Sequence, residues 1–223
     1  MADLNGDGAA AVAQDIGGLG IACDVSNETD LIRLIEQTEA QAGPIGLFCS
    51  NAGILVSDPD WDNPASAPTD AWMRSWGVNV MAHVYAARHL VPRMAGRGGG
   101  YFLNTVSAAG LLSQIGSGPY SATKHAALGF AENLAISTRD RGIRVSALCP
   151  QGVDTPMLHS LDRGIPDRDG VLSPEAIADA VVAGLDTEQF LILPHPEVAT
   201  YVRRKADNPD RWLAGMARLR RSF

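Results

Sequence analysis

Tyr120 and Lys124 lie four residues apart in a segment with a helical pattern, so their side chains share one face of the expected helix. An ammonium group beside a phenol favours the phenolate and lowers the tyrosine pKa from its usual value of about 10. A tyrosine with a lowered pKa can donate or accept a proton near neutral pH. The pair alone is a weak indication of catalysis, because most Tyr-x-x-x-Lys pairs lie on protein surfaces without a chemical role.

Other polar or turn-forming residues stand at the ends of predicted strands or in a long predicted helix. They are Asn51-Ala52-Gly53, Asn79, Ser107 and Pro150. The carboxyl ends of parallel strands meet at one edge of a sheet, which is where ligands bind in such folds. Core packing alone does not explain why these residues converge there, so the sequence predicts a functional site at this edge.

The elements that must position these residues alternate between short apolar segments and helical patterns, which is typical of a parallel α/β sheet. The predicted strands are residues 19–25, 45–50, 101–106, 144–149 and 190–193. Each is apolar nearly throughout, so we expect helices on both faces. The predicted helices are residues 5–16, 27–43, 71–96, 119–141 and 174–185. Residues 58–69 and 157–171 have loop composition, and no break in composition divides the chain, so residues 1–223 are expected to form one domain.

Composition places the chain among ordinary globular proteins. It has 223 residues, of which 46% are hydrophobic and 19% charged, and this excludes a disordered or collagen-like chain. No apolar run approaches the ~20 residues of a membrane-spanning helix. Cys23, Cys49 and Cys149 are odd in number and far apart, which favours a reducing, cytoplasmic location. The histidines are scattered without the spacing of metal ligands, so no metal site is predicted.

The net charge of −7 is unevenly distributed. The segment from Tyr201 onward contains seven basic residues and two aspartates, so it carries a net charge of +5 and the rest of the chain −12. A basic segment can bind nucleic acid or an acidic surface. Apolar residues at helical spacing favour instead a docked helix with a solvated basic face; they are Trp212, Leu213, Met216 and Leu219.

Taken together, these positions resemble the short-chain dehydrogenase/reductase family over essentially the whole chain. The resemblance rests on Asp24-Val25, Asn51-Ala52-Gly53, Asn79, Ser107, Tyr120 with Lys124, and the run from Pro150 to Pro156. It implies a Rossmann-like, doubly wound parallel sheet and an oxidoreductase that transfers a hydride between a nicotinamide cofactor and a secondary alcohol or ketone. It also implies a homodimer or homotetramer packed through helices 71–96 and 119–141, with a small-molecule partner and neither nucleic acid nor membrane.

The resemblance assigns a catalytic role to four residues. Tyr120 would be the general acid/base on the substrate oxygen, and Ser107 would orient that oxygen. Lys124 would lower the Tyr120 pKa and hold the hydroxyls of the nicotinamide ribose. Asn79 would hold a water molecule that links Lys124 to solvent. These roles agree with the chemistry, because hydride transfer to or from a carbonyl leaves or consumes a proton on its oxygen.

The resemblance also implies a set of cofactor contacts. Asp24 and Val25 would border the adenine, Asn51, Ala52 and Gly53 would lie along the cofactor, and Val153 and Thr155 would meet the nicotinamide carboxamide, with Pro150 and Gly152 in the same loop. Gln151 stands where the family usually has glycine, and we expect its side chain to tilt this loop near the nicotinamide. Residues 157–171 correspond to the segment that closes over the substrate in the family.

Asp3 is the candidate that selects the cofactor. An acidic residue after the second strand accepts hydrogen bonds from the ribose hydroxyls and repels a 2′-phosphate, so Asp3 predicts NAD in preference to NADP. The glycine-rich phosphate loop belongs about 20 residues before such an acid. The glycine clusters at 17–20 and 98–100 precede strands instead of opening helices, so we interpret both as turns.

From this spacing we expect a truncated fold. The first strand and helix and most of the second strand, on the order of 30 residues, would be absent. The strand at 19–25 would then lose its partners, and the 223-residue chain would bind NAD weakly or not at all. Two alternatives remain: a catalytically silent chain that acts only by association, and a nucleic-acid binder that uses the basic C-terminal segment, which the acidic bulk of the chain disfavours.

Overall fold

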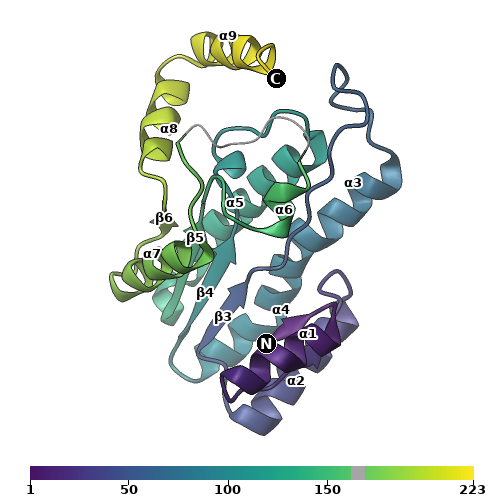
Figure 1. Ribbon diagram of the computed structural model, residues 1–223. Helices are drawn as coiled ribbons and strands as arrows, with labels where there is room; N and C mark the ends of the chain where they lie inside the picture. The colour runs from purple at the N-terminus through teal and green to yellow at the C-terminus, as the bar shows by residue number, and fades with distance from the viewer. Residues whose placement is uncertain (162–168) are drawn as a thin grey trace.

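The computed structural model describes residues 1–161 and 169–223 (Figure 1). Every paired strand within them is parallel. A two-stranded sheet joins β1 (Ala2–Asp3) to β2 (Ile21–Ala22), and a four-stranded sheet has the order β3 (Leu47–Ser50), β4 (Gly100–Thr105), β5 (Ile143–Leu148) and β6 (Leu191–Ile192). The expected parallel α/β fold is therefore confirmed.

Helices connect successive strands and cover the sheet. They are α1 (Gly6–Asp15), α2 (Glu28–Ala42), α3 (Thr69–Trp76), α4 (Ala82–Gly96), α5 (Gly118–Thr138), α6 (Pro156–His159), α7 (Pro174–Asp186), α8 (Glu197–Asp207) and α9 (Pro209–Arg220). The sequence offers Ser26 or Asn27 as the cap of α2 and Ser173 as the cap of α7. In the structure Asn27 accepts the backbone N–H of Thr29 at the start of α2, and Ser173 accepts that of Ala176 at the start of α7. None of the helices in the described ranges is long and apolar enough to cross a membrane.

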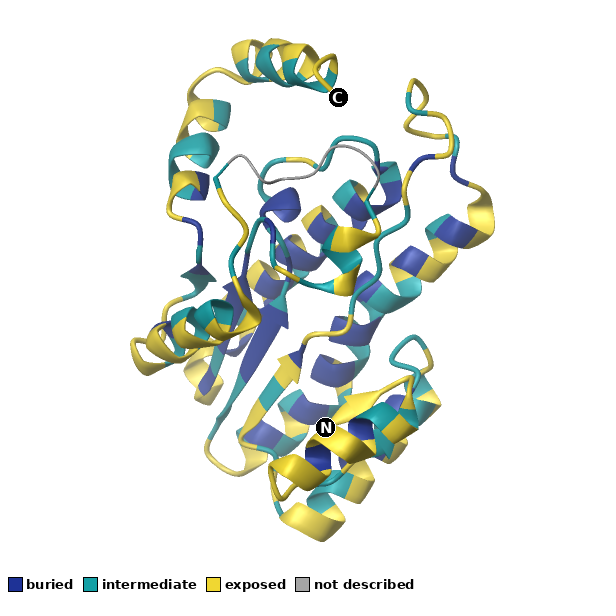
Figure 2. Ribbon diagram, viewed as in Figure 1, coloured by how far each residue is buried: buried dark blue, intermediate teal, exposed yellow. Residues whose placement is uncertain are grey.

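The core lies mainly on one side of the four-stranded sheet. Side chains alternate along β4, so Phe102 packs into the large cluster with Leu90 and Met94 of α4, whereas Leu103 faces the smaller cluster beside α7. Helices α4 and α5 thus cover one face and α7 covers the other (Figure 1). Figure 2 shows that β4 and β5 are the most deeply buried strands, and their carboxyl ends support the residues expected to do chemistry.

Two predicted elements differ from the structure. The predicted helix over 71–96 is two helices, α3 and α4, joined by a π-helical turn at Gly77–Met81. This turn is a local widening that places Asn79 in the interior, and the 3.6-residue pattern of the sequence contains no sign of it. The predicted loop at 157–171 begins with α6, because Thr155 caps that helix and Pro156 occupies its first turn. Residues 162–168 of that loop lie outside the described residues.

The expectations for the first strands are partly wrong. The strand predicted at 19–25 does not lose every partner, because β2 pairs with β1, where the Cys23 N–H donates to the Asp3 carbonyl at 2.9 Å.

The prediction that helices cover both faces of every strand is also wrong. In β3, Leu47 is 44% exposed and Cys49 is exposed, because both side chains point to the side that faces away from α4. The glycine clusters are turns, as predicted, with φ of +65° at Gly17 and +134° at Gly99.

Candidate active site

The start of α5 holds Tyr120 in place through contacts with the segment before α3. Ser117 caps the helix by accepting the Tyr120 N–H at 3.3 Å, and its hydroxyl donates to the Val56 carbonyl. The buried carboxylate of Asp58 accepts the Gly118 N–H at 2.9 and 3.0 Å. A carboxylate at a helix N-terminus is favoured by the helix dipole. The position of Tyr120 is therefore fixed by long-range hydrogen bonds as well as by its own helix.

Tyr120, Lys124 and Ser107 come together as predicted, from two structural segments: α5 and the turn after β4. The Lys124 Nζ lies 5.5 Å from the centre of the Tyr120 ring and donates to the Thr105 carbonyl at 3.1 Å. Ser107 follows β4, and its hydroxyl donates to the Pro150 carbonyl at 3.5 Å. The same Ser107 oxygen accepts the Ala109 N–H at 3.1 Å, which fixes its orientation. The phenol and the ammonium are both buried.

Burial is the largest influence on the pKa values of Tyr120 and Lys124. Burial raises the pKa of Tyr120 above its usual value, although the hydrogen bond with Ser107 works in the opposite direction. Burial also lowers the pKa of Lys124 to about 8. The net shift of the Tyr120 pKa is therefore upward, and the lowering by Lys124 that the resemblance implies stays a prediction.

Asn79 lies close to this group, and its hydrogen bonds with protein atoms go to Ile54 and Thr123. Its side chain is fully buried, and its Oδ1 accepts the Ile54 N–H at 2.9 Å. Its Nδ2 donates to the Ile54 carbonyl at 2.9 Å and to the Thr123 hydroxyl at 3.0 Å. A Cβ at Gly53 would lie 3.4 Å from the Lys124 Nζ and 3.5 Å from the Asn79 Oδ1. Asn79 therefore clamps the segment after β3 against α5, directly beside Lys124.

Sequence reasoning missed a buried polar pair beside these residues. The His83 Nδ1 lies 3.1 Å from the Asn104 Oδ1, and both side chains are buried. Burial, followed by the charge of Lys124, lowers the pKa of His83 to about 4, so the imidazole is neutral. Its Nε2 has no hydrogen-bond partner among the described residues. The available signal was spacing, because His83 lies four residues after Asn79.

One cavity of about 2110 Å³ contains most of the predicted site. The predicted residues that line it are Asp3, Asp24, Val25, Asn51, Ala52, Gly53, Ser107, Tyr120, Lys124, Pro150, Val153 and Thr155. Asn79 and Gly152 are not part of the lining. Asp3 keeps a local role as well, since its Oδ1 accepts the Asn5 N–H at 2.8 Å. A dinucleotide and a second small molecule fit this volume, because pockets for single small molecules measure roughly 300–1,000 Å³.

The loop that carries Val153 and Thr155 is held by residues that the sequence did not indicate. The Gln151 N–H donates to the Nδ1 of buried His195 at 3.2 Å. The Gln151 side chain donates to the Asp169 Oδ2 at 3.0 Å, and the Asp169 Oδ1 accepts the Tyr201 hydroxyl at 2.8 Å. Gln151 therefore connects the loop to α8, which explains how a side chain is accommodated at this position.

Comparison with known proteins identifies relatives of the chain. A family model described as short chain dehydrogenase matches residues 1–165. The match begins at the first residue, and the predicted absence of an N-terminal strand and phosphate loop stays a prediction. A 1-deoxy-11-beta-hydroxypentalenate dehydrogenase from Streptomyces exfoliatus is 33% identical over 218 residues, which cover 93% of this chain and 78% of the relative.

Two further relatives match a shorter part of the chain or have a lower sequence identity. A 3beta-hydroxysteroid dehydrogenase 2 from Eggerthella lenta is 33% identical over 163 residues, covering 69% of this chain and 60% of the relative. Among solved structures, a short chain dehydrogenase/reductase from Burkholderia phymatum in complex with NAD is 26% identical. Its TM-score is 0.82, and the match covers 94% of this chain and 84% of that structure.

Proposed function

Since the chain belongs to the short-chain dehydrogenase/reductase family, we propose that it interconverts a secondary alcohol and a ketone with NAD, using Tyr120 as the general acid/base. One observation carries this proposal. Ser107, which follows β4, lines one cavity together with Tyr120 and Lys124 of α5. The same cavity is lined by the residues expected to contact a nicotinamide cofactor. Relatives named as dehydrogenases of hydroxylated compounds support the substrate class.

In this proposal, the side chains of the site hold the substrate oxygen and move its proton. Ser107 hydrogen-bonds with that oxygen and orients it toward Tyr120. The raised pKa of Tyr120 keeps the phenol protonated at neutral pH, ready to donate to a carbonyl oxygen. With a pKa of about 8, Lys124 remains largely charged at neutral pH and stabilises the phenolate that forms after donation. The nicotinamide cofactor, when bound, supplies or accepts the hydride.

The residues along the cavity fit NAD. Asp3 lies on the lining with one carboxylate oxygen engaged by Asn5, and the other is the candidate acceptor for ribose hydroxyls. Its negative charge disfavours the 2′-phosphate of NADP. Asn51 is anchored for its role, because its Oδ1 accepts the Thr105 hydroxyl at 2.9 Å. The Burkholderia phymatum structure in complex with NAD supports this choice of cofactor.

Replacement of Tyr120 by Phe tests the proposed reaction. The wild-type chain is mixed with NAD and a panel of secondary alcohols, and NADH formation is followed by absorbance. Tyr120→Phe is expected to lower turnover about 10²–10⁴-fold, the usual contribution of a general acid/base. Tyr85→Phe is the matched control, because Tyr85 lies on α4 outside the cavity lining and stacks against Arg88. It should keep wild-type turnover.

Calorimetric titration with NAD completes the test. Tyr120→Phe should bind NAD as the wild type does, so its loss of turnover is assigned to proton transfer. Retention of turnover in Tyr120→Phe would refute the role given to Tyr120. A wild-type chain that forms no NADH with any alcohol, even at millimolar NAD, would favour the alternative of a silent chain that acts by association.

A further inference from the structure

The cavity extends beyond the predicted site to the C-terminal helices. Trp212, Met216 and Leu219 of α9 contribute an apolar wall to it. These residues were expected to dock on a core, whereas they face the cavity. In Figure 1, β1 and α9 lie at opposite ends of the molecule, so this wall is far from Asp3. The additional space is therefore placed for a substrate and not for the adenosine end of a cofactor.

Four hydrogen bonds, two from Lys205 and two from Arg220, hold α8 and α9 over the cavity. Lys205 of α8 donates to the carbonyls of Leu111 and Leu112, at 2.7 and 2.9 Å, just after the turn that follows Ser107. At the end of α9, Arg220 donates to the Trp61 carbonyl and to the Asp62 Oδ1, and its guanidinium lies 5.7 Å from the centre of the Trp61 ring. The helices are thus attached near the catalytic serine and near the segment before α3, and they form a fixed wall.

The basic residues of this segment fall into three groups. Lys205 and Arg220 make the attachments just described, and Arg203 and Arg221 lie outside the cavity lining. The third group lines the cavity and consists of Arg204, Arg211 and Arg218. Among the lining side chains of α8 and α9, these three face a single acidic one, that of Asp207. Asp169, which accepts the Tyr201 hydroxyl of α8, also lines the cavity here, so three guanidinium groups stand beside two carboxylates and the side-chain charge at this end is positive.

The three lining arginines have no acidic partner in the described part of the chain. No carboxylate of residues 1–161 or 169–223 lies within ion-pairing distance of their guanidinium groups. Arg204 instead packs 5.9 Å from the centre of the Tyr201 ring, which fixes its orientation. Guanidinium groups bind carboxylates through paired hydrogen bonds, so this end of the cavity has the chemistry of an anion site.

We infer that the substrate carries a carboxylate that binds Arg204, Arg211 and Arg218 while its apolar body packs on Trp212 and Met216. This inference rests on the proposed function, because it places the reacting hydroxyl or carbonyl at Tyr120. A carboxylate is favoured over a phosphate, since the apolar wall beside the arginines makes the desolvation of a dianion more costly than that of a single charge. The substrate class is therefore an apolar hydroxy or keto acid.

A comparison of acids with their esters tests the inference. The probes are medium-chain and long-chain fatty acids with a secondary hydroxyl next to the terminal methyl, each paired with its methyl ester. Calorimetry on the full chain is expected to give about tenfold tighter binding of the acid, equivalent to ~1.4 kcal/mol. The triple substitution Arg204→Gln, Arg211→Gln and Arg218→Gln should abolish this preference and leave ester binding unchanged.

The matched control is the double substitution of Arg203→Gln and Arg221→Gln, which removes positive charge from the same helical segment outside the cavity. It should keep the preference for the acid. Equal affinities for acid and ester in the wild type, absence of acid binding, or a preference that survives the triple substitution would overturn the inference. Turnover is measured in parallel: selective acid binding without turnover contradicts the proposed reaction alone, whereas equal turnover of acid and ester contradicts the carboxylate site alone.

Discussion

Asn79→Ala removes a side chain that the fold buries completely and that makes three hydrogen bonds. Two of them satisfy the backbone N–H and carbonyl of Ile54, and both groups lose their partner in the variant. A buried polar group left without a partner costs about 1–3 kcal/mol. Because Ile54 is only partly buried, the low end applies to each group. The Thr123 hydroxyl keeps the Pro119 carbonyl as its acceptor, at 2.8 Å, and adds little.

Asn79→Ala is therefore expected to lower the free energy of unfolding by about 2–4 kcal/mol, once the void left by the removed side chain is included. For a chain of this size each kcal/mol lowers the melting temperature by roughly 2–4 °C, so the variant should melt roughly 5–15 °C below the wild type. Thermal unfolding followed by circular dichroism measures this shift. Asn133→Ala, on the exposed side of α5, is the control and should change stability by less than ~0.5 kcal/mol.

Asn79→Asp sharpens the test because it preserves shape and removes the donor. One carboxylate oxygen can still accept the Ile54 N–H, but the other faces the Ile54 carbonyl, which is also an acceptor. At neutral pH this variant should be at least as unstable as Asn79→Ala, and acid should partly restore it by returning a proton to donate. A melting temperature of Asn79→Ala within about 1 °C of the wild type, or an Asn79→Asp variant as stable as wild type, would refute the clamp.

Two further perturbations follow from individual contacts. A Cβ at Gly110 would lie 2.6 Å from the Lys124 carbonyl, so Gly110→Ala should push the turn after β4 away from α5 and destabilise the fold by about 1–3 kcal/mol, measured by urea unfolding. Burial raises the pKa of Glu39, but hydrogen bonds from Arg97 and Arg93 outweigh it and hold that pKa at about 2. This stabilisation is present above the usual value of 4.5 and is lost as the pH falls toward 2. Glu39→Gln should therefore cost ~1 kcal/mol at neutral pH, because solvent screens the exposed arginines.

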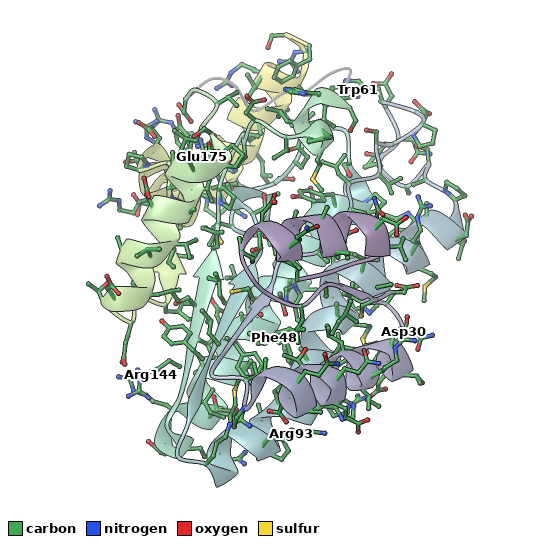
Figure 3. All side chains as sticks on the ribbon, turned by 60° about the horizontal axis from the view of Figure 1, so that its bottom comes forward. Asp30, Phe48, Trp61, Arg93, Arg144 and Glu175 are labelled. Carbon is green, nitrogen blue, oxygen red and sulfur yellow. The ribbon has the colours of Figure 1, made fainter. Side chains whose placement is uncertain are left out.

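Gly110→Ala has a matched control, and the Glu39→Gln prediction is checked by its dependence on pH. Gly129→Ala lies on the same helix as Lys124, and its Cβ would meet nothing within 4 Å, so it should be neutral or slightly stabilising. Figure 3 shows Arg93 beside α2. The ion pair between Glu39 of α2 and Arg93 of α4 should weaken as the Glu39 carboxylate is protonated. A Gly110→Ala variant as stable as Gly129→Ala contradicts the close packing. A difference between wild type and Glu39→Gln that persists unchanged down to about pH 2 contradicts the assigned ion pairs.

Much of the fold could be predicted from the sequence because its signals are local. Caps such as Asn27 and Ser173 lie immediately before the helices they begin, and each is found there. The convergence of Ser107 with Tyr120 and Lys124 was also predictable, since parallel strands place their carboxyl ends at one edge. The π-helical turn around Asn79 was not predictable in this way. It depends on hydrogen bonds to Ile54, which lies 25 residues away.

The same distinction explains why the surroundings of the basic segment could only be predicted in part. Helical spacing identified Trp212 and Met216 as one apolar side, and the structure confirms that they share a surface. What that surface faces depends on where α8 is attached, and the attachment is made by Lys205 to carbonyls more than 90 residues earlier in the chain. Composition therefore predicted the net charge of the segment, but not which of its basic residues attach the helices and which line the cavity.

The charge states at Tyr120 and Lys124 follow from a competition that spacing cannot resolve. Attraction between neighbours on one helix favours phenolate beside ammonium, whereas burial of both groups favours the neutral phenol and the neutral amine. The opposite shifts of the two pKa values, upward for Tyr120 and downward for Lys124, show that burial prevails. The unliganded pair is consequently poised to donate a proton, and donation from Tyr120 leaves a negative charge that Lys124 can then stabilise. The burial that opposes charge separation at rest also strengthens this attraction once the phenolate has formed, because the surrounding dielectric is low.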